Sequence, residues 1–262
     1  MSEGEGSLPP APLGPEGAAP AGPGPKGISA GSAVTGVFFQ PGATFSALLK
    51  SPTWWLPFLI MVAVTFGSIL VVTPKIDMDR SMREAMEKRA EKTGQTVSQE
   101  QVQRATEMSK KFTALAGPIG TTVAAIFFFI LAGILWGGAR AFGAEVSYKQ
   151  TMAVWGHANL ANCVGALFAM AVFWQIPNES VTQLGVARLV KSNPGAFLPD
   201  GTPQSVLALA SSFDIFALGT LALLVVAFRR FPGLSKATGT AVPVGLWALY
   251  VIGKTCWAAL FS

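Results

Sequence analysis

The sequence predicts an all-α polytopic integral membrane protein with about five transmembrane helices. Only 13% of its 262 residues are charged, whereas a soluble domain carries about 25%. The apolar residues gather in blocks of roughly 20, the length that crosses a hydrocarbon core of about 30 Å as a helix. These blocks lack the period-two alternation of strands, so the class is all-α. A helical hairpin is expected between spans one and two.

Residues 1–34 precede the apolar blocks and consist mostly of Pro, Gly, Ala and Ser. Such a segment has too few apolar side chains to offset its ordering entropy, so we expect a disordered tail. A signal peptide is not expected, because no basic stretch is followed by an apolar one. The membrane domain should therefore occupy residues 35–262.

Turn residues and charges bound the predicted spans. Thr73-Pro74 ends the first span, and Thr202-Pro203 offers the fourth a cap and a first-turn proline. Arg229-Arg230 closes the fourth with two cations at the negative end of the helix dipole. The expected spans cover residues 54–73, 115–139, 151–174, 204–228 and 241–261.

The largest polar segment, residues 75–111, separates the first two spans. Methionines recur at every fourth position over Met78–Met86, which places a narrow apolar stripe on a charged helix. Gly94 is a plausible helix stop, and Ser98 followed by Gln101 forms a capping box for a second helix. We expect a helical hairpin that stands on the membrane or folds back onto it.

The stretch "FFQPGATFSALLKSPTWWLPFLI", residues 38–60, leads into the first span. Phe45 shares an apolar face with two leucines, so this short helix is expected to lie in the headgroup layer. The tryptophan pair that follows is typical of the membrane–water boundary. The lead-in motif comprises Pro41, Phe45, Pro52, Trp54 and Trp55.

Polar residues interrupt the later spans, and we take Asn159, Asn162, Asp214 and Lys254 as a candidate intramembrane cluster. An ionisable group near the bilayer centre costs about 2.5–3.5 kcal/mol on insertion scales, so it requires a partner or a purpose. Counted from the Arg229 end, Asp214 and Lys254 lie at depths of ~21 Å and ~18 Å. Two interpretations stay open: an Asp214–Lys254 ion pair, or a Lys254 side chain that snorkels to water.

The two asparagines lie on one face of the third span, where they either join helices by hydrogen bonds or line a path for a proton or solute. His157, the only histidine, has no Cys, His or acidic neighbour at ligand spacing, so no metal site is expected. The chain contains no HExxH, GxSxG or phosphate-binding loop motif. We therefore expect neither catalytic residues nor a cofactor. Its basic residues flank apolar blocks, so nucleic-acid binding is not expected either.

Several of these stretches resemble the Yip-domain (Ypt-interacting protein) family of five-span membrane proteins. "QPGATFSALLKSPTWWLPFLI" is similar to the family's approach to the first span. "SSFDIFALGTLALLVVAF", "LSKATG" and "VGLWALYVIGKTCWAAL" are similar to its last two spans. The likeness covers about residues 37–261. It implies a five-span fold with a cytosolic N-terminus. The compact style of this chain is typical of a protein of the bacterial inner membrane.

The resemblance also bears on partners. Eukaryotic members are implied in vesicle traffic and in binding Rab-type GTPases. This chain inserts the charged hairpin, has "GHANLAN" where many members carry an aromatic-Ser-x-x-Pro step, and lacks an organised binding segment in its tail. We therefore do not expect it to bind a small GTPase. Contact with the bilayer, and with membrane protein partners or a second copy, is expected.

Charge distribution gives the expected orientation. The connections on the same side as the tail carry Arg140, Lys149, Arg229-Arg230 and Lys236, against Arg188 and Lys191 on the other side. This excess favours a cytoplasmic N-terminus, although the hairpin carries nine Lys and Arg of its own beside seven acidic residues.

Two functions remain in view from the sequence. The first is a non-enzymatic membrane scaffold or adaptor that binds membrane proteins or shapes the bilayer. The second is a small transporter or channel component that uses the polar groups of spans three to five. The sequence shows neither repeat halves nor broken helices, which many transporters have, and this favours the scaffold.

Overall fold

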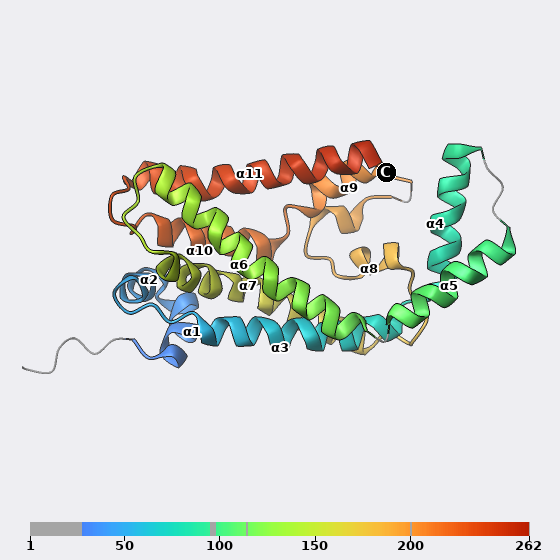
Figure 1. Cartoon of the computed structure of the whole chain (residues 1–262), viewed down its shortest axis with the longest axis horizontal. Coiled ribbons are helices and arrows are strands. Elements are labelled where there is room, and N and C mark those ends of the chain that lie inside the picture. Colours follow the sequence, from blue (N-terminus) through green and yellow to red (C-terminus); the bar gives the residue numbers. More distant parts are fainter. Residues whose placement is uncertain (1–27, 95–97, 114, 200, 262) are drawn as a thin grey trace, which may run out of the picture.

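The computed structural model describes residues 28–94, 98–113, 115–199 and 201–261. Long helices run side by side along the axis of an elongated bundle (Figure 1). These are α3 (Trp55–Val72), α6 (Ala116–Ala141), α7 (Tyr148–Trp174), the pair α9 (Gln204–Ser211) and α10 (Ile215–Phe228), and α11 (Lys236–Phe261). Four of them are long and apolar enough to cross a membrane, and the α9–α10 pair makes a fifth span if counted as one. The predicted all-α polytopic fold is confirmed.

Shorter helices occupy the two ends of the bundle (Figure 1). Helices α1 (Ala30–Phe39) and α2 (Pro41–Lys50) lie at one end together with the α6–α7 and α10–α11 turns, and we call this the tail-side end. The opposite, hairpin end carries the C-terminus and the following elements: η1 (Thr73–Lys75), α4 (Met78–Thr93), α5 (Gln99–Thr113), α8 (Gln183–Leu189) and η2 (Pro194–Phe197).

Helix α7 is the centre of the bundle and packs against α3, α6 and α10. Small residues permit this close packing. A Cβ added to Gly156 would come within 3.0 Å of the Pro57 side chain, so α3 and α7 approach at a glycine. Close approach at small residues is the usual basis of helix association in membranes, because lipid offers no hydrophobic driving force between helices.

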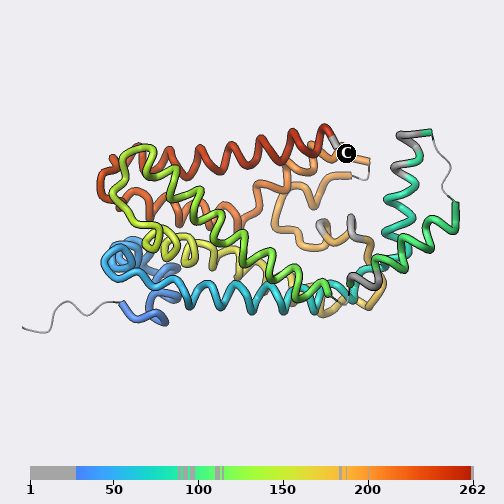
Figure 2. The backbone as a smooth tube through the Cα atoms, viewed as in Figure 1, coloured from blue at the N-terminus to red at the C-terminus, as the bar shows by residue number. Residues whose placement is uncertain are grey.

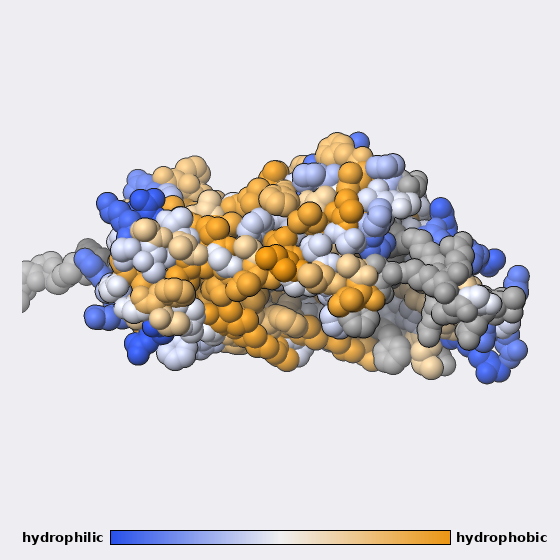
Figure 3. Space-filling view, turned by 90° about the horizontal axis from the view of Figure 1, so that it is seen from above, coloured by the Kyte–Doolittle hydropathy of each residue, from blue (hydrophilic) through white to orange (hydrophobic). Residues whose placement is uncertain are grey.

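The outer surface of the bundle is apolar around its middle. Figure 3 shows an apolar band there with hydrophilic residues at both ends. Large apolar side chains such as Ile126 and Phe127 on α6, and Leu249 and Ile252 on α11, are more than one third exposed. A water-soluble protein does not expose a continuous apolar belt of this kind, so these helices contact the lipid bilayer.

Helix α1 corrects the expectation of a disordered tail that reaches residue 34. The helix begins at Ala30, four residues before that boundary, and the Ser29 hydroxyl caps it by accepting from the Ser32 N–H at 3.1 Å. Ala33 and Val37, one turn apart, are fully buried. Composition predicted disorder here because residues 30–34 are small residues like those of the preceding segment. Their burial against α2 nevertheless stabilises a helix. Residues 1–27 lie outside the described part of the chain.

The predicted spans one to three lie within a few residues of α3, α6 and α7. The fifth span starts earlier than expected. Helix α11 begins at Lys236 rather than at residue 241. The preceding residue, Ser235, caps it, because its hydroxyl accepts from the Thr238 N–H at 3.0 Å. Pro243 lies inside the helix, where a proline usually interrupts or kinks it.

The hairpin between the first two spans is confirmed and projects beyond the bundle (Figure 2). Gly94 ends α4 in the left-handed conformation with φ of 67°, as the sequence predicts. Ser98 and Gln101 form the expected reciprocal pair at the start of α5. The Gln101 N–H donates to the Ser98 hydroxyl at 3.2 Å, and the Ser98 N–H donates to the Gln101 side chain at 3.2 Å.

Candidate functional site

Counted as one span, the α9–α10 pair is broken, which corrects the expectation of one continuous helix over residues 204–228. Helices α9 and α10 meet at an angle of 50°, with Ser212, Phe213 and Asp214 between them. The broken span also overturns the statement that the chain lacks the broken helices of many transporters. Sequence hydropathy did not reveal the break. The mean hydropathy of an apolar block changes little when three of its residues leave the helical conformation, so the average carries no information about the backbone there.

Hydrogen bonds to side chains explain why the chain breaks here. Asp214 caps α10, since its Oδ1 accepts from the N–H groups of Phe216 at 2.9 Å and Ala217 at 3.2 Å. The hydroxyls of Ser211 and Ser212 donate to the Ala208 carbonyl at 3.1 Å and 2.8 Å. Ser and Asp side chains compete with the backbone in this way and favour helix ends over helix interiors. The sequence indication of the break is the Ser-Ser-x-Asp motif, Ser211 to Asp214, inside an apolar block.

A loop from the hairpin end reaches the break. The other carboxylate oxygen of Asp214 accepts from the Ser192 hydroxyl, and the Ile215 N–H donates to the Ser192 carbonyl at 3.0 Å. Ser192 precedes η2, which packs against α9. The loop therefore satisfies backbone and side-chain groups that the break leaves free inside an apolar region, where unpaired polar groups are costly.

Lys254 lies on the other side of the same break. Its Nζ donates to the hydroxyls of Ser211 at 2.9 Å and Ser212 at 3.3 Å. Both serines stand at the C-terminal end of α9, where a cation is favoured by the helix dipole. The break thus holds Asp214 and Lys254, but each has serine partners, so the direct ion pair considered from the sequence is not formed.

The depth of Lys254 differs from the expectation because α11 starts earlier. Lys254 is 18 residues from Lys236, which corresponds to about 27 Å at 1.5 Å per residue. Asp214 is about 21 Å from the Phe228 end of α10 by the same measure. Lys254 is therefore displaced toward the hairpin end and meets the serines just before Asp214.

The two asparagines form a separate pair on α7. The Asn162 Nδ2 donates to the Asn159 Oδ1 at 2.9 Å, which agrees with their predicted common face. Their neighbours Ala161 and Gly165 lie against the first turns of α10, where an added Cβ on Gly165 would come within 2.6 Å of Phe216. The asparagines are thus near the α10 start in depth, but no hydrogen bond among the described residues joins them to Asp214 or Lys254.

His157 is fully buried in α7, one turn away from its Nδ1 partner, the Ala153 carbonyl at 2.8 Å. Its Nε2 has no hydrogen-bond partner among the described residues. The helix's own backbone therefore supplies the one hydrogen-bond partner of this imidazole found in the described residues.

The Phe45 face of the lead-in motif turns inward rather than toward lipid. Phe45 and Leu48 are fully buried and belong to the hydrophobic core, because α2 packs against α7 and α10. This corrects the expected placement of that face in the headgroup layer. The amphipathic pattern of α2 is real, but a protein surface rather than lipid covers it, and the pattern alone cannot distinguish the two.

The remaining members of the motif flank α2 and the start of α3. Pro41 is the first residue of α2, and Pro52 follows the end of that helix at Lys50. Trp54 packs edge-on against Phe58 and Phe129, with ring centroids 5.9 Å apart in each case. Trp55 is 50% exposed at the start of α3.

The base of the hairpin is tied to the connection between α7 and α8, a contact that the sequence did not indicate. The Glu179 N–H donates to the Pro74 carbonyl at 3.0 Å, and the Val181 N–H donates to the Lys75 carbonyl at 3.1 Å. In return the Asp77 N–H donates to the Val181 carbonyl at 2.8 Å. Residues more than 100 positions apart therefore clamp the start of α4.

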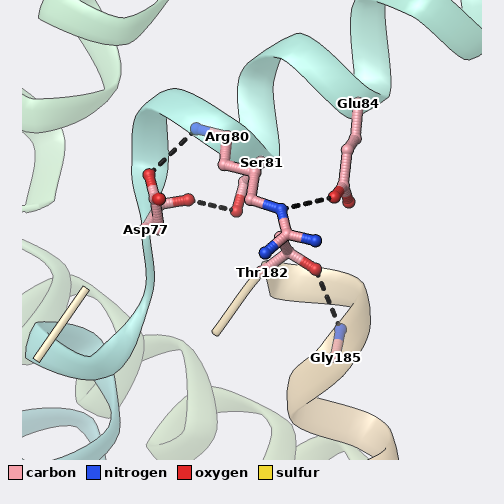
Figure 4. Close-up of polar contacts among 6 residues, drawn as sticks. All are labelled: Asp77, Arg80, Ser81, Glu84, Thr182 and Gly185. Carbon is pink, nitrogen blue, oxygen red and sulfur yellow. Dashed lines mark hydrogen bonds and ion pairs between the residues drawn. The ribbon is translucent and has the colours of Figure 1, made fainter. Parts of the chain in front are cut away.

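Figure 4 shows the side chains that finish this clamp. The Asp77 carboxylate caps α4 by accepting from the Arg80 N–H at 2.9 Å, and the Ser81 hydroxyl donates to the Asp77 carbonyl at 2.6 Å. The Thr182 hydroxyl caps the neighbouring α8 by accepting from the Gly185 N–H at 3.3 Å. Two helices thus start side by side from one small backbone junction.

Comparison with known proteins places this arrangement in a family. The family model of the Yip1 domain matches residues 35–256, which include the lead-in motif, the hairpin, the break and Lys254. The chain belongs to the Yip1 domain family. The resemblance drawn from the sequence is therefore confirmed, and the match ends close to the predicted limits of the likeness.

A bacterial relative supports the same assignment. This Yip1 chain is 24% identical to the membrane protein YknW of Bacillus subtilis (strain 168) over 218 residues, 83% of this chain and 86% of that protein. No solved structure matches the chain. The protein is thus an integral membrane member of the Yip1 family with a bacterial homologue.

Proposed function

We propose that this Yip1-family protein is a non-enzymatic scaffold or adaptor that binds other membrane proteins, or a second copy of itself, through the α4–α5 hairpin. The observation that carries the proposal is the hairpin's position: it stands beyond the apolar bundle, where a partner can reach both of its helices (Figures 1 and 2). Its placement in a bacterial cytoplasmic membrane with a cytoplasmic N-terminus is part of the proposal, and it puts the hairpin on the outer side.

The clamp at the hairpin base supports this role. Backbone bonds between Pro74–Asp77 and Glu179–Val181 hold the start of α4 in one direction relative to the bundle. Farther along, the Ser109 hydroxyl donates to the Met78 sulfur at 3.2 Å and joins α5 to α4. A presenting element that is already ordered loses less conformational entropy when it binds, which favours affinity.

The hairpin surface also has a feature suited to binding. Met108 on α5 is 60% exposed among charged neighbours, whereas Thr106 on the same helix is buried. Methionine is flexible and polarisable and is frequent on surfaces that accept protein partners. We assign Met108 to the contact surface.

Site-specific photocrosslinking in native membranes tests the scaffold proposal. A photoreactive amino acid at Arg104 should give a defined adduct with one membrane protein or with a second copy. Met108→Glu should abolish that adduct, and Glu107→Gln should leave it. Recovery of the monomer alone from position 104, or an adduct that survives Met108→Glu, would contradict the assignment.

The broken fourth span favours a second candidate function, a small transporter or channel component. Broken helices with polar groups at the break are typical of ion and solute sites in transporters. Asp214, Lys254 and the pair Asn159–Asn162 would supply the polar groups. Proton or solute flux into proteoliposomes that is lost in Lys254→Met would support it, and no flux at any pH would remove it.

A further inference from the structure

Cations from four separate parts of the chain gather at the tail-side end of the bundle. Each of these side chains is exposed, and the hydrophilic residues at this end flank the apolar band in Figure 3. The basic end comprises Lys50, Arg140, Lys149, Arg229, Arg230 and Lys236. Within residues 28–50, 140–150 and 229–236, Glu145 is the only carboxylate.

Tertiary contacts bring the segments that carry these cations together at one end of the bundle. The Glu145 N–H donates to the Pro232 carbonyl at 2.8 Å, so the α6–α7 and α10–α11 turns touch. Gly233 adopts φ of 82° against Gly143, and a Cβ added to it would lie 2.2 Å from the Gly143 oxygen. This junction brings the segment that carries Arg140, three residues before Gly143, to the same turn pair as the segment that carries Lys236, three residues after Gly233.

Helix α2 adds its own cation to the same end. The Gln150 Nε2 donates to the Leu49 carbonyl at 2.6 Å, which places the end of α2, where Lys50 lies, against the first turn of α7, which carries Lys149. Arg230 lies over Gly42, where a Cβ would come within 2.1 Å of its Nη2. Each contact joins segments that are far apart along the chain, so the basic end is a product of the fold.

Among the described residues, no ion pair joins a carboxylate to a cation of the basic end. The ion pairs found in the described residues are Arg80–Glu84 and Arg104–Glu100, and both lie in the hairpin. Charges at the ends of membrane helices face lipid headgroups, and an unpaired cation there attracts anionic ones.

We propose that the basic end binds the headgroups of anionic phospholipids in the leaflet that it faces. The recognised group is the lipid phosphate, which guanidinium groups can hold with two parallel hydrogen bonds. Phe142, two residues from Arg140, is 63% exposed, and Phe39 at the end of α1 is 84% exposed. Cations can bind the phosphate of a lipid while a neighbouring aromatic side chain contacts its acyl chains. An acidic protein offers the negative charge without the acyl chains, so the exposed aromatic side chains favour a lipid.

Titration of the full-length protein in neutral detergent with phosphatidylglycerol or phosphatidylcholine tests the proposal, with native mass spectrometry counting bound lipid. The variant Arg140→Gln/Arg229→Gln/Lys236→Gln removes cations whose side chains make no hydrogen bond among those found in the described residues. Each neutralised cation should weaken phosphatidylglycerol binding about fivefold, and all three together roughly a hundredfold. Phosphatidylcholine binding should not change.

The matched control is Arg80→Gln/Arg83→Gln/Arg104→Gln, which removes the same charge from the hairpin and should bind phosphatidylglycerol as the unaltered protein does. Arg140→Lys/Arg229→Lys/Lys236→Arg keeps the charge and should retain at least a tenth of the affinity; if it does not, while remaining folded, charge is not what binds the lipid.

Four further outcomes would overturn the proposal. The first is equal affinity of the unaltered protein for both lipids, and the second is an equal loss in the hairpin control. The third is competition by glycerol phosphate at the lipid's own concentration, which would indicate a soluble phosphate site. Preferential binding of polyglutamate over phosphatidylglycerol vesicles would likewise assign the surface to an acidic protein.

Discussion

Asp214 performs two tasks at the break in the fourth span. One carboxylate oxygen caps α10, and the other accepts a hydrogen bond from Ser192 in the loop that reaches the break. The cap needs an oxygen acceptor rather than a charge, so the residue's role in the fold can be separated from its ionisation by substitution.

Replacing Asp214 tests this separation. Asp214→Ala removes both acceptors and should lower the free energy of unfolding by about 1–3 kcal/mol, since a helix cap and a partner of Ser192 are lost. Asp214→Asn keeps an acceptor oxygen and should lose less than half of that. Thermal unfolding in detergent measures both. Equal losses would show that the charge, and not the cap, stabilises the break.

Gly233 and Gly94 offer a matched pair at positive φ. Gly94 has φ of 67° with open space around it, so Gly94→Ala should cost about 1–2 kcal/mol of stability from conformation alone. Gly233→Ala adds a steric contact with the Gly143 oxygen and should destabilise the protein clearly more. The melting temperatures of the two variants decide this, and a smaller effect at Gly233 would mean that the turn junction is not tightly packed.

At the scale of the element, the α1–α2 pair shows that apolar residues of one sequence stretch can face either the protein core or the outside of the bundle. The two helices approach closely, because a Cβ on Gly36 would lie 2.5 Å from the Thr44 hydroxyl oxygen. Phe45 faces the core, whereas Phe39 at the end of α1 is 84% exposed. Two phenylalanines six residues apart therefore have opposite environments.

Truncation of these two side chains gives the test. Phe45→Ala opens a cavity in the core and should cost about 3–5 kcal/mol of unfolding free energy. Phe39→Ala removes an exposed ring and should change it by less than about 0.5 kcal/mol. Membrane insertion, assayed by carbonate extraction, should persist in both variants. Loss of insertion in Phe45→Ala would show that α2 directs the first span into the bilayer.

In the α4–α5 hairpin, by contrast, local sequence signals were sufficient to predict the structure. The left-handed Gly94, the Ser98–Gln101 capping box and the methionine spacing all depend on residues within four positions of each other. Such signals were enough to predict two helices and the turn between them. They did not indicate the clamp to Glu179–Val181, because that partner lies more than 100 residues away.

At the scale of the whole molecule, orientation is the property that the proposals share. The basic end and the hairpin lie at opposite ends of the bundle (Figure 1), so they face opposite sides of the membrane. With a cytoplasmic N-terminus, the basic end meets the cytoplasmic leaflet and the hairpin stands outside. Anionic lipid headgroups in the cytoplasmic leaflet would then face the cations of the basic end.

Cysteine accessibility in intact cells tests this orientation. A membrane-impermeant maleimide should label Glu87→Cys on the hairpin before lysis. It should label Ala141→Cys at the tail-side end only after permeabilisation. Both positions are exposed, and Cys256→Ser removes the exposed native thiol beforehand. Labelling in the reverse order would place the N-terminus outside and the hairpin in the cytoplasm.

The sequence by itself determined the class, the approximate spans, the hairpin and its caps. Each of these follows from interactions within a turn or two of helix, or from the length of an apolar block relative to the bilayer. Family membership also followed from the sequence, because the motifs around residues 40–60 and 211–260 are contiguous stretches.

Only the tertiary structure decided which surfaces meet. It buried Phe45 against protein, extended a helix into the expected tail, set Lys254 on the serines of a broken span, and gathered the cations of the basic end. These outcomes depend on contacts between segments such as Leu49 and Gln150, which lie 101 residues apart. Periodicity shows that a face is apolar or basic, but packing alone decides whether protein or lipid covers it.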